Sequence, residues 1–209
     1  MNHLPDEAST VMVDVVFSLE EGSFPDDHAD ALSLAVRRAL PWFDDEPEAG
    51  ILRLSGVAHG NDGVCFVGRR SRLVLRLPIH RGASADSLAG ARLDLDGCWL
   101  TLGKSSMRPL LPARGVVYSH LVSVGTSDEV EFLAICKSLL AERNLNPQLI
   151  SGKAHQLRSA QGAVLGFSLM LHGLGSAESL AVQEFGLGTH RALGCGLFIP
   201  HKSVVAVGG

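Results

Sequence analysis

The first residue with the chemistry of a catalyst is His28, near the start of a predicted helix. It follows Pro25-Asp26-Asp27, a sequence that favours a helix start, and it precedes the apolar Leu32 by one helical turn. This spacing places the imidazole at the exposed end of the buried helix face. Because histidine titrates near neutral pH, His28 is a candidate for proton transfer, either as general acid or as general base. An ordinary surface histidine in the first turn of a helix is the alternative.

A second group of candidates lies on a predicted β-hairpin. Residues 147–157 and 163–171 are strand-like, and the turn-forming residues between them favour a hairpin. The first of these two segments carries Lys153 and His155, and Arg158 follows it directly. Cations on a hairpin tip can reach the phosphate backbone of a nucleic acid. We therefore expect this hairpin to contact phosphate, although basic side chains also keep exposed strands soluble.

The third group is a glycine-rich segment, residues 186–196. Its four glycines are Gly186, Gly188, Gly194 and Gly196. Glycine lets the backbone turn tightly and bring bare N–H groups against a ligand, and Arg191 and Lys202 supply cations nearby. The segment is therefore predicted to cradle phosphate, with a plain connector as the alternative.

Several common sites are excluded by spacing. Gly103-Lys104-Ser105 is not a nucleotide-binding P-loop, because Cys98 stands where that motif needs glycine. A dinucleotide fingerprint also fails in the glycine-rich segment, because its third glycine position is Arg191. The nine histidines form no H-x-x-x-H or H-E-x-x-H pair, and the four cysteines form no C-x-x-C pair. We expect neither a metal nor another cofactor.

The elements that must position these residues follow the order β-α-β-β-α-β twice. In the first copy, the strand Val11–Leu19 precedes a turn at 21–23 and the helix of His28, and a short strand around Trp99–Leu102 ends the copy. The segment Lys104–Gly115 is turn-prone and basic, which favours a linker. The second copy begins at Val116, contains the hairpin, and ends beyond the glycine-rich segment. The sequence thus predicts an α+β fold of two tandem ferredoxin-like (RRM-like) domains, residues 1–103 and 116–209.

Composition agrees with a globular chain of this kind. With 209 residues, 46% of them hydrophobic, two small cores can form. No segment reaches the roughly 18 apolar residues of a membrane span, and the N-terminus has no secretion-signal pattern. We therefore expect a cytoplasmic protein without a membrane partner. The net charge is −4, but residues 1–50 hold 12 acidic and two basic residues, whereas residues 51–114 hold ten basic and four acidic ones. A basic surface can therefore exist beside an acidic one.

Taken with these motifs, the chain resembles the CRISPR repeat-cleaving endoribonucleases of the RAMP superfamily, the Cas-six family, in particular its MYXAN-type subgroup. The most specific parts are Leu180–Pro200 and Asp27-His28 at the first helix. The resemblance implies two ferredoxin-like domains and a glycine-rich loop that touches RNA. It also implies a histidine near the first helix that takes part in cleavage, here His28, and a hairpin near the cut, here Lys153 to Arg158.

The resemblance further implies a function. CRISPR repeat RNA would be cut without a metal, the RNA 2′-hydroxyl attacking the adjacent phosphate to leave a 2′,3′-cyclic phosphate and a 5′-hydroxyl. The product would stay bound as guide RNA, and other effector-complex subunits are possible partners. Many members of the family pair the histidine with a nearby tyrosine or lysine. Here residues 20–50 contain no lysine, and the one tyrosine, Tyr118, lies on a predicted strand. This departure leaves the second catalytic group open, with Lys153 and Arg158 as candidates. The alternatives are a non-catalytic RAMP subunit that only holds guide RNA, and a domain that binds a small phosphorylated ligand.

Overall fold

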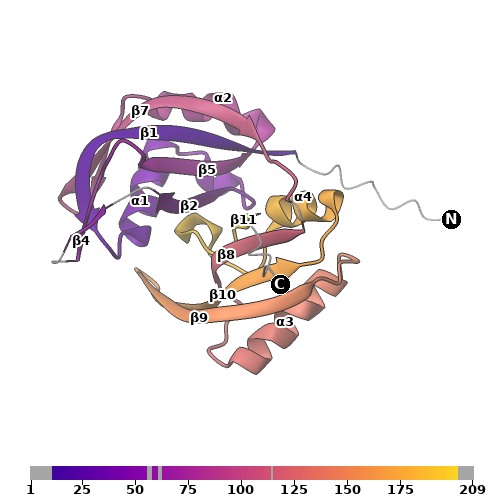
Figure 1. Cartoon of the computed structure of the whole chain (residues 1–209). Coiled ribbons are helices and arrows are strands. Elements are labelled where there is room, and N and C mark those ends of the chain that lie inside the picture. The colour runs from indigo at the N-terminus through magenta and orange to yellow at the C-terminus, as the bar shows by residue number, and fades with distance from the viewer. Residues whose placement is uncertain (1–10, 56–57, 61–62, 114, 202–209) are drawn as a thin grey trace, which may run out of the picture.

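The structure, a computed structural model, describes residues 11–55, 58–60, 63–113 and 115–201 and consists of two antiparallel sheets with helices packed on them (Figure 1). The elements of the first half are β1 Met12–Pro25, α1 Ala29–Ala39, β2 Gly50–Ser55, β3 Ala58–His59, β4 Val64–Phe66, β5 Arg72–Pro78, α2 Ile79–Ala85, β6 Arg92–Leu95 and β7 Cys98–Pro109. Those of the second half are β8 Val116–Val122, α3 Glu129–Ala141, β9 Gln148–Ser159, β10 Gly162–His172, α4 Ser176–Phe185 and β11 Ile199–Pro200. Short 3-10 turns, η1 Phe43–Asp45, η2 Asp86–Leu88 and η3 Arg191–Leu193, join some of them.

The two sheets repeat one strand order. In the first half β1 lies between β5 and β7, and β2 pairs with the outer side of β5. In the second half β8 lies between β10 and β11, and β9 pairs with the outer side of β10. Each half therefore places its first strand between its third and fourth main strands, which is the ferredoxin-like arrangement. This confirms the predicted α+β fold of two ferredoxin-like repeats.

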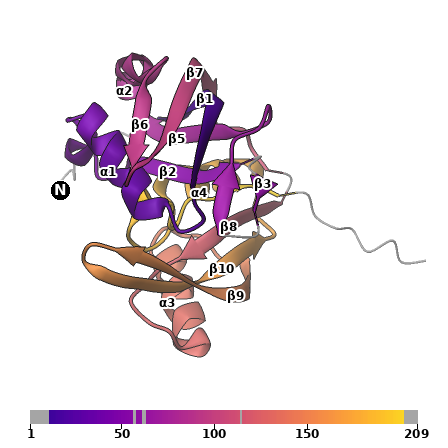
Figure 2. The same ribbon diagram turned by 90° about the vertical axis from the view of Figure 1, so that its left-hand side faces the viewer.

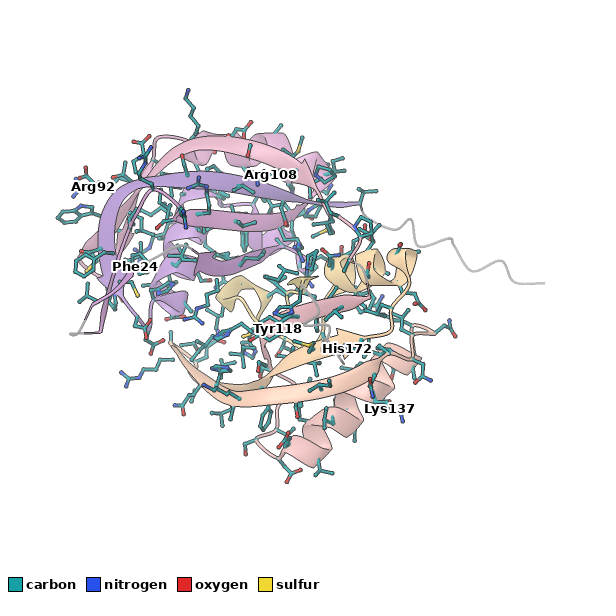
Figure 3. The ribbon with its side chains drawn as sticks, viewed as in Figure 1. Phe24, Arg92, Arg108, Tyr118, Lys137 and His172 are labelled. Carbon is teal, nitrogen blue, oxygen red and sulfur yellow. The ribbon has the colours of Figure 1, made fainter. Side chains whose placement is uncertain are left out.

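Each half has its own hydrophobic core. In the first, Val15 and Phe17 of β1 pack with Leu32 and Val36 of α1. In the second, Phe132 of α3 packs with strand residues of β8 and β10 and with α4. The helices of each half therefore cover one face of its own sheet. Figure 2 shows the same two bodies from the side, and Figure 3 shows side chains occupying the space between them.

Two parts of the first half differ from expectation. β1 does not end at residue 19 but continues to Pro25 through register shifts near Leu19, so residues 21–23 are strand and not turn. β7 continues to Pro109 and pairs with β1, so the linker predicted from residue 104 begins at Leu110. The polar and basic residues of β7 misled the prediction, because much of this long strand is exposed and tolerates them.

Two arginines join the halves. Arg76 of β5 is 1% exposed, pairs with Asp14 at 2.8 Å, and donates to the carbonyl oxygens of Gln183 and Phe198 in the second half. Arg191 makes a comparable link from the other side, described below. These two links between the halves fix the space in which the candidate site lies.

In the described ranges, no helix is long and apolar enough to cross a membrane.

Candidate active site

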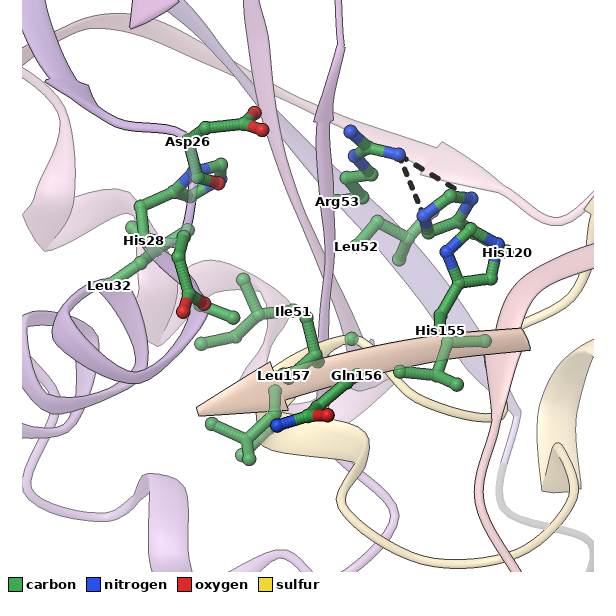
Figure 4. Close-up of a pocket in the computed structure, with 16 residues that line it drawn as sticks. Asp26, His28, Leu32, Ile51, Leu52, Arg53, His120, His155, Gln156 and Leu157 are labelled. Carbon is green, nitrogen blue, oxygen red and sulfur yellow. Dashed lines mark hydrogen bonds between the residues drawn. The ribbon is translucent and has the colours of Figure 1, made fainter. Parts of the chain in front are cut away.

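A cavity of about 270 Å³ lies where the two halves meet. Its wall comes from five places in the fold: the start of α1, β2, β8, β9 and η3 with the following Gly194. Figure 4 shows His28 on one side, and Arg53, His120 and His155 on the other. Both halves are needed to form this wall, so the cavity depends on their assembly.

His28 is the cap residue directly before α1. The residue is 7% exposed, and its ring meets that of Phe24 edge-on, with 4.6 Å between the ring centroids. Nδ1 lies 3.0 Å from the carbonyl oxygen of Pro25 and 2.9 Å from that of Asp26. Because carbonyl oxygens only accept, Nδ1 carries the proton of the neutral ring, which leaves Nε2 to accept one. Burial lowers the pKa of His28 and outweighs these two hydrogen bonds, and the charge of Arg53 lowers it further.

Arg53 and His120 form a pair across the halves, from β2 to β8. Nη1 of Arg53 lies 2.7 Å from Nε2 of His120 and 3.4 Å from Nδ1. A guanidinium only donates, so Nε2 of His120 is the acceptor. Burial, followed by the charges of Arg53 and His155, lowers the pKa of His120 to about 4. His120 is therefore neutral at neutral pH.

His155 of β9 lies beside His120, with 4.2 Å between the ring centroids. Burial lowers its pKa, as do the nearby charges of Arg53 and Lys153. The structure thus brings the predicted His155 into the same cavity wall as His28. Lys153 is exposed on the same strand, close enough for its charge to act on His155.

Arg158 lies toward the other end of β9, near the start of α1. Its Nε is 3.6 Å from the carboxylate of Asp27, and its side chain is 87% exposed. Asp27 lines the cavity and precedes His28. Such an exposed pair contributes little stability and separates easily. Arg158 is therefore available at the His28 side of the cavity, whereas Lys153 is near the His155 side.

The hairpin itself matches its prediction. β9 and β10 pair from Gln148 opposite His172 to Ser159 opposite Gly162. Tyr118, the one tyrosine of the chain, lies on β8, and its ring packs against that of His201 with 5.6 Å between the ring centroids.

The glycine-rich segment packs against the protein in a way that the sequence did not reveal. Gly196 donates its N–H to Leu121 at 2.7 Å, and Gly194 donates to Arg191 at 2.9 Å. These two amides are therefore engaged within the protein, whereas the expected phosphate cradle stays a prediction. A Cβ at Gly196 would lie 1.9 Å from the carbonyl oxygen of Leu187, and one at Gly188 would lie 2.2 Å from that of Ser123.

The individual glycines therefore have different positions. Gly194 lines the cavity. Gly186 and Gly188 border a separate hollow against α3. Gly196 is buried. In this segment Gly194 is thus the predicted glycine nearest to His28 and Arg53.

Arg191 also differs from its predicted role. Its guanidinium donates to the carbonyl oxygens of Glu48, Phe185 and Glu184, at 2.8, 2.6 and 3.0 Å. Burial lowers its pKa to about 10, so the side chain stays charged at neutral pH. With its donors turned to three carbonyls, Arg191 acts first as a link between the halves. Lys202 lies outside the described residues.

Arg53 and His120 were not predicted as site residues. Arg53 stands between Leu52 and Leu54 in a strand, and His120 stands in the apolar run of β8. The only signal in the sequence was one arginine in β2 and one histidine in β8, two strands whose other residues are uncharged. In the described ranges, the cavity included, no three His, Cys, Asp or Glu side chains are grouped as a metal site would require.

Comparison with known proteins places this chain in a family. The family model described as Cas6 Crispr matches residues 13–203, nearly the whole chain. The chain belongs to the Cas6 family. A relative from Myxococcus xanthus (strain DK1622), the CRISPR-associated endonuclease Cas6, is 35% identical over 195 residues, which cover 91% of this chain and 82% of the relative. The recognition of this family from the sequence is confirmed.

Solved structures show the same fold. A CRISPR associated protein Cas6 matches with a TM-score of 0.63 at 12% identity, covering 92% of this chain and 99% of the other. A RAMP protein binding different RNA substrates matches with a TM-score of 0.62 at 14% identity, covering 92% and 100%. Cse3 from Thermus thermophilus, bound to an RNA representing a pre-cleavage complex, matches at 0.52 and 17% identity, covering 90% and 98%. The Cas6 fold thus extends over nearly all of this chain.

Proposed function

We propose that this Cas6 family member is an endoribonuclease that cuts CRISPR repeat RNA to guide RNA by a metal-independent reaction and then retains its product. The reaction class follows from the family and from the endonuclease of Myxococcus xanthus. The observation that carries the mechanism is the hydrogen bonding of His28. Its Nδ1 is held by two carbonyl oxygens, beside a cavity that Arg53 also lines.

His28 acts as the general base in this proposal. Nε2 takes the proton of the RNA 2′-hydroxyl, the 2′-oxygen forms a bond to the adjacent phosphorus, and the bond to the 5′-oxygen breaks. The products are a 2′,3′-cyclic phosphate and, after a proton returns to the departing oxygen, a 5′-hydroxyl. Nδ1 is already held by the Pro25 and Asp26 carbonyls, so the ring is oriented before RNA arrives.

The second catalytic group is proposed to come from β9. Arg158 lies near Asp27 at the His28 side, and Lys153 lies near His155. Either cation would offset negative charge on the phosphorane, and Lys153 is also able to return a proton to the 5′-oxygen. His155 and Gly194, both in the cavity wall, are proposed to contact the RNA.

The test is single-turnover cleavage of the cognate repeat in EDTA, at saturating protein. We expect His28→Ala to lose about 10²–10⁴ in rate while RNA affinity is kept, because one acid–base group is removed. The Lys153→Ala/Arg158→Ala double variant should slow cleavage more than it weakens binding. His80→Ala is the matched control, since His80 is an exposed histidine of α2 bonded to Glu46.

Two results would contradict the proposed cleavage reaction, and a third would contradict retention of the product. A folded parent protein that binds the repeat but leaves it intact would favour the non-catalytic RAMP subunit. A His28→Ala variant that cuts within about threefold of the parent would remove His28 from the reaction. Retention is checked with RNA in excess: product should stop accumulating once it equals the protein, and continued turnover would contradict it.

A further inference from the structure

Arg53 differs from Arg76 and Arg81 because those two arginines each pair with a carboxylate. Arg76 pairs with Asp14, and Arg81 pairs with Glu46. Arg53 is exposed and lines the cavity, and its guanidinium donates a hydrogen bond to the ring of His120. In the part of the chain that the structure describes, no carboxylate lies within ion-pair distance of Arg53. Among the described residues, its positive charge is therefore not paired with a carboxylate.

The hydrogen bond to His120 holds this charge in place. Nη1 donates to Nε2 of His120 at 2.7 Å, which uses one of the five donors of the guanidinium. The neighbouring ring of His155 packs against His120 at 4.2 Å and supports its orientation. The remaining donors of the planar guanidinium are left for an acceptor with two oxygens, such as a phosphodiester.

Arg53 lies in the cavity wall on the side opposite His28 (Figure 4). Its charge lowers the pKa of His28 as well as those of His120 and His155, so the guanidinium is within electrostatic range of all three rings. Gly194 closes the same wall: a Cβ added there would lie 3.7 Å from the backbone nitrogen of Arg53. A phosphate that reaches Arg53 therefore lies in the same cavity that His28 lines.

We propose that Arg53 binds the scissile phosphate, and that His120 is a positioning residue that holds the Arg53 guanidinium by accepting its hydrogen bond. This inference rests on the proposed function, because it assigns two residues to that reaction. Arg53 would bind the phosphate before the reaction and offset the charge that grows on its oxygens as the 2′-oxygen attacks. His120 would not touch RNA.

The first arm of the test concerns Arg53. Single-turnover cleavage by Arg53→Ala should fall about 10²–10³-fold, the usual effect of losing a donor to a developing oxyanion. Arg53→Lys should recover only part of this loss, since an ammonium lacks the two-pronged geometry. Arg92→Ala is the control, because Arg92 lies on β6 over the ring of Trp99, away from the cavity.

The second arm separates positioning from general structural support. In His120→Gln the amide oxygen can still accept from Arg53, whereas in His120→Leu nothing can. We expect the Gln variant to keep most of the cleavage rate and the Leu variant to lose much of what Arg53→Ala loses. Arg53→Ala/His120→Leu should be no slower than Arg53→Ala alone, because the two residues act through one contact. Equal losses in the Gln and Leu variants, or additive losses in the double variant, would overturn the role of His120.

The outcomes also distinguish this inference from the proposed function. If the parent cuts the repeat and Arg53→Ala cuts at the same rate, the inference is wrong and the proposed function stands. If the parent does not cut, the proposed function is wrong, and affinity for the intact repeat decides the inference. Arg53→Ala should then bind more weakly and with a smaller salt dependence, by about one phosphate contact. Unchanged affinity would overturn it.

Discussion

A histidine that accepts a proton needs a free ring nitrogen and a pKa below the working pH. His28 meets the first condition through its bonds from Nδ1 to the carbonyl oxygens of Pro25 and Asp26. It meets the second because burial lowers its pKa from the usual 6.5. The same burial would work against a general acid, whose protonated form it disfavours. The geometry thus favours the general-base role that we propose for His28 over the general-acid role.

The pH dependence of cleavage follows from this assignment. With its pKa below 6.5, His28 is mostly neutral at pH 7 and gains little from further deprotonation. Single-turnover cleavage in EDTA should therefore be flat from about pH 7 to about pH 8 and should fall as the pH drops through the lowered pKa of His28. RNA affinity measured at each pH is the control. A rate that falls steadily from about pH 6 to about pH 8 would identify a protonated histidine, and hence a general acid.

Residues of the site differ in how far the sequence could predict them. His28 was predictable because helix-start residues and a downstream apolar stripe determine its place locally. Arg53 and His120 could not be predicted, because their contact depends on how the sheet of β2 packs against the sheet of β8. The two residues are 67 positions apart, so their spacing in the sequence does not indicate that their side chains are close in space.

At the scale of elements, the glycine-rich segment shows the same limit. Its glycines did predict tight turns, and Gly194 and Gly196 have φ of +87° and +69°. The partners of its amides were not predictable, because they belong to β8 and to the segment itself. Cys195 and Leu193 pack against Leu121 and thereby hold the segment down.

Two glycines of this segment should respond differently to alanine. Gly196→Ala should destabilise the protein strongly, because its Cβ would lie 1.9 Å from a backbone oxygen. Gly194→Ala places its Cβ 3.1 Å from the carbonyl oxygen of Ile51, in the cavity wall, and should mainly lower RNA affinity and cleavage, with a backbone cost of about 1–3 kcal/mol. Thermal melting and repeat-RNA affinity are the measurements.

Gly97→Ala is the matched control for this comparison. Gly97 has φ +86° and nothing within 4 Å of an added Cβ, so it carries the backbone strain of Gly194 without the contact. If Gly97→Ala and Gly194→Ala have the same effect on RNA affinity, Gly194 is not part of the RNA-binding surface.

β1 shows where patterns of secondary structure mislead. Gly22 and its neighbours look like a turn, yet the strand continues and bends there, with φ of +143° at Gly22 and register shifts against β7. A Cβ at this glycine would lie 2.2 Å from the carbonyl oxygen of Trp99. The glycine thus serves a close approach of two strands, which a local turn signal cannot distinguish from a chain reversal.

At the scale of the whole molecule, the candidate cavity depends on the joint between the halves, which Arg76 and Arg191 form with carbonyl oxygens. Arg76→Met should lower the free energy of unfolding by about 3–5 kcal/mol, because Asp14 loses its partner and two carbonyl oxygens lose a donor. The melting temperature should fall by about 2–4 °C for each kcal/mol. Chemical or thermal unfolding measures this effect.

Two further variants test the cause of that loss. Arg72→Met removes a half-buried arginine from the same strand and should be nearly neutral. Asp14→Leu/Arg76→Met removes both charges and should recover part of the stability. If Arg72→Met and Arg76→Met destabilise equally, the joint is not maintained by Arg76.

The joint has a consequence for how sequences of this kind can diverge. Across it, Arg76 and Arg191 bind main-chain oxygens of the opposite half, at Gln183 and Phe198 in one case and at Glu48 in the other. Every amino acid supplies such an oxygen, so mutation at the accepting positions leaves the acceptor in place. Selection for these contacts then acts on the two donors, whereas the accepting side chains answer only to their own packing, as Phe198 does in the core of the second half. We therefore expect the spacing between the halves to be kept in related sequences even where the side chains around the cavity differ.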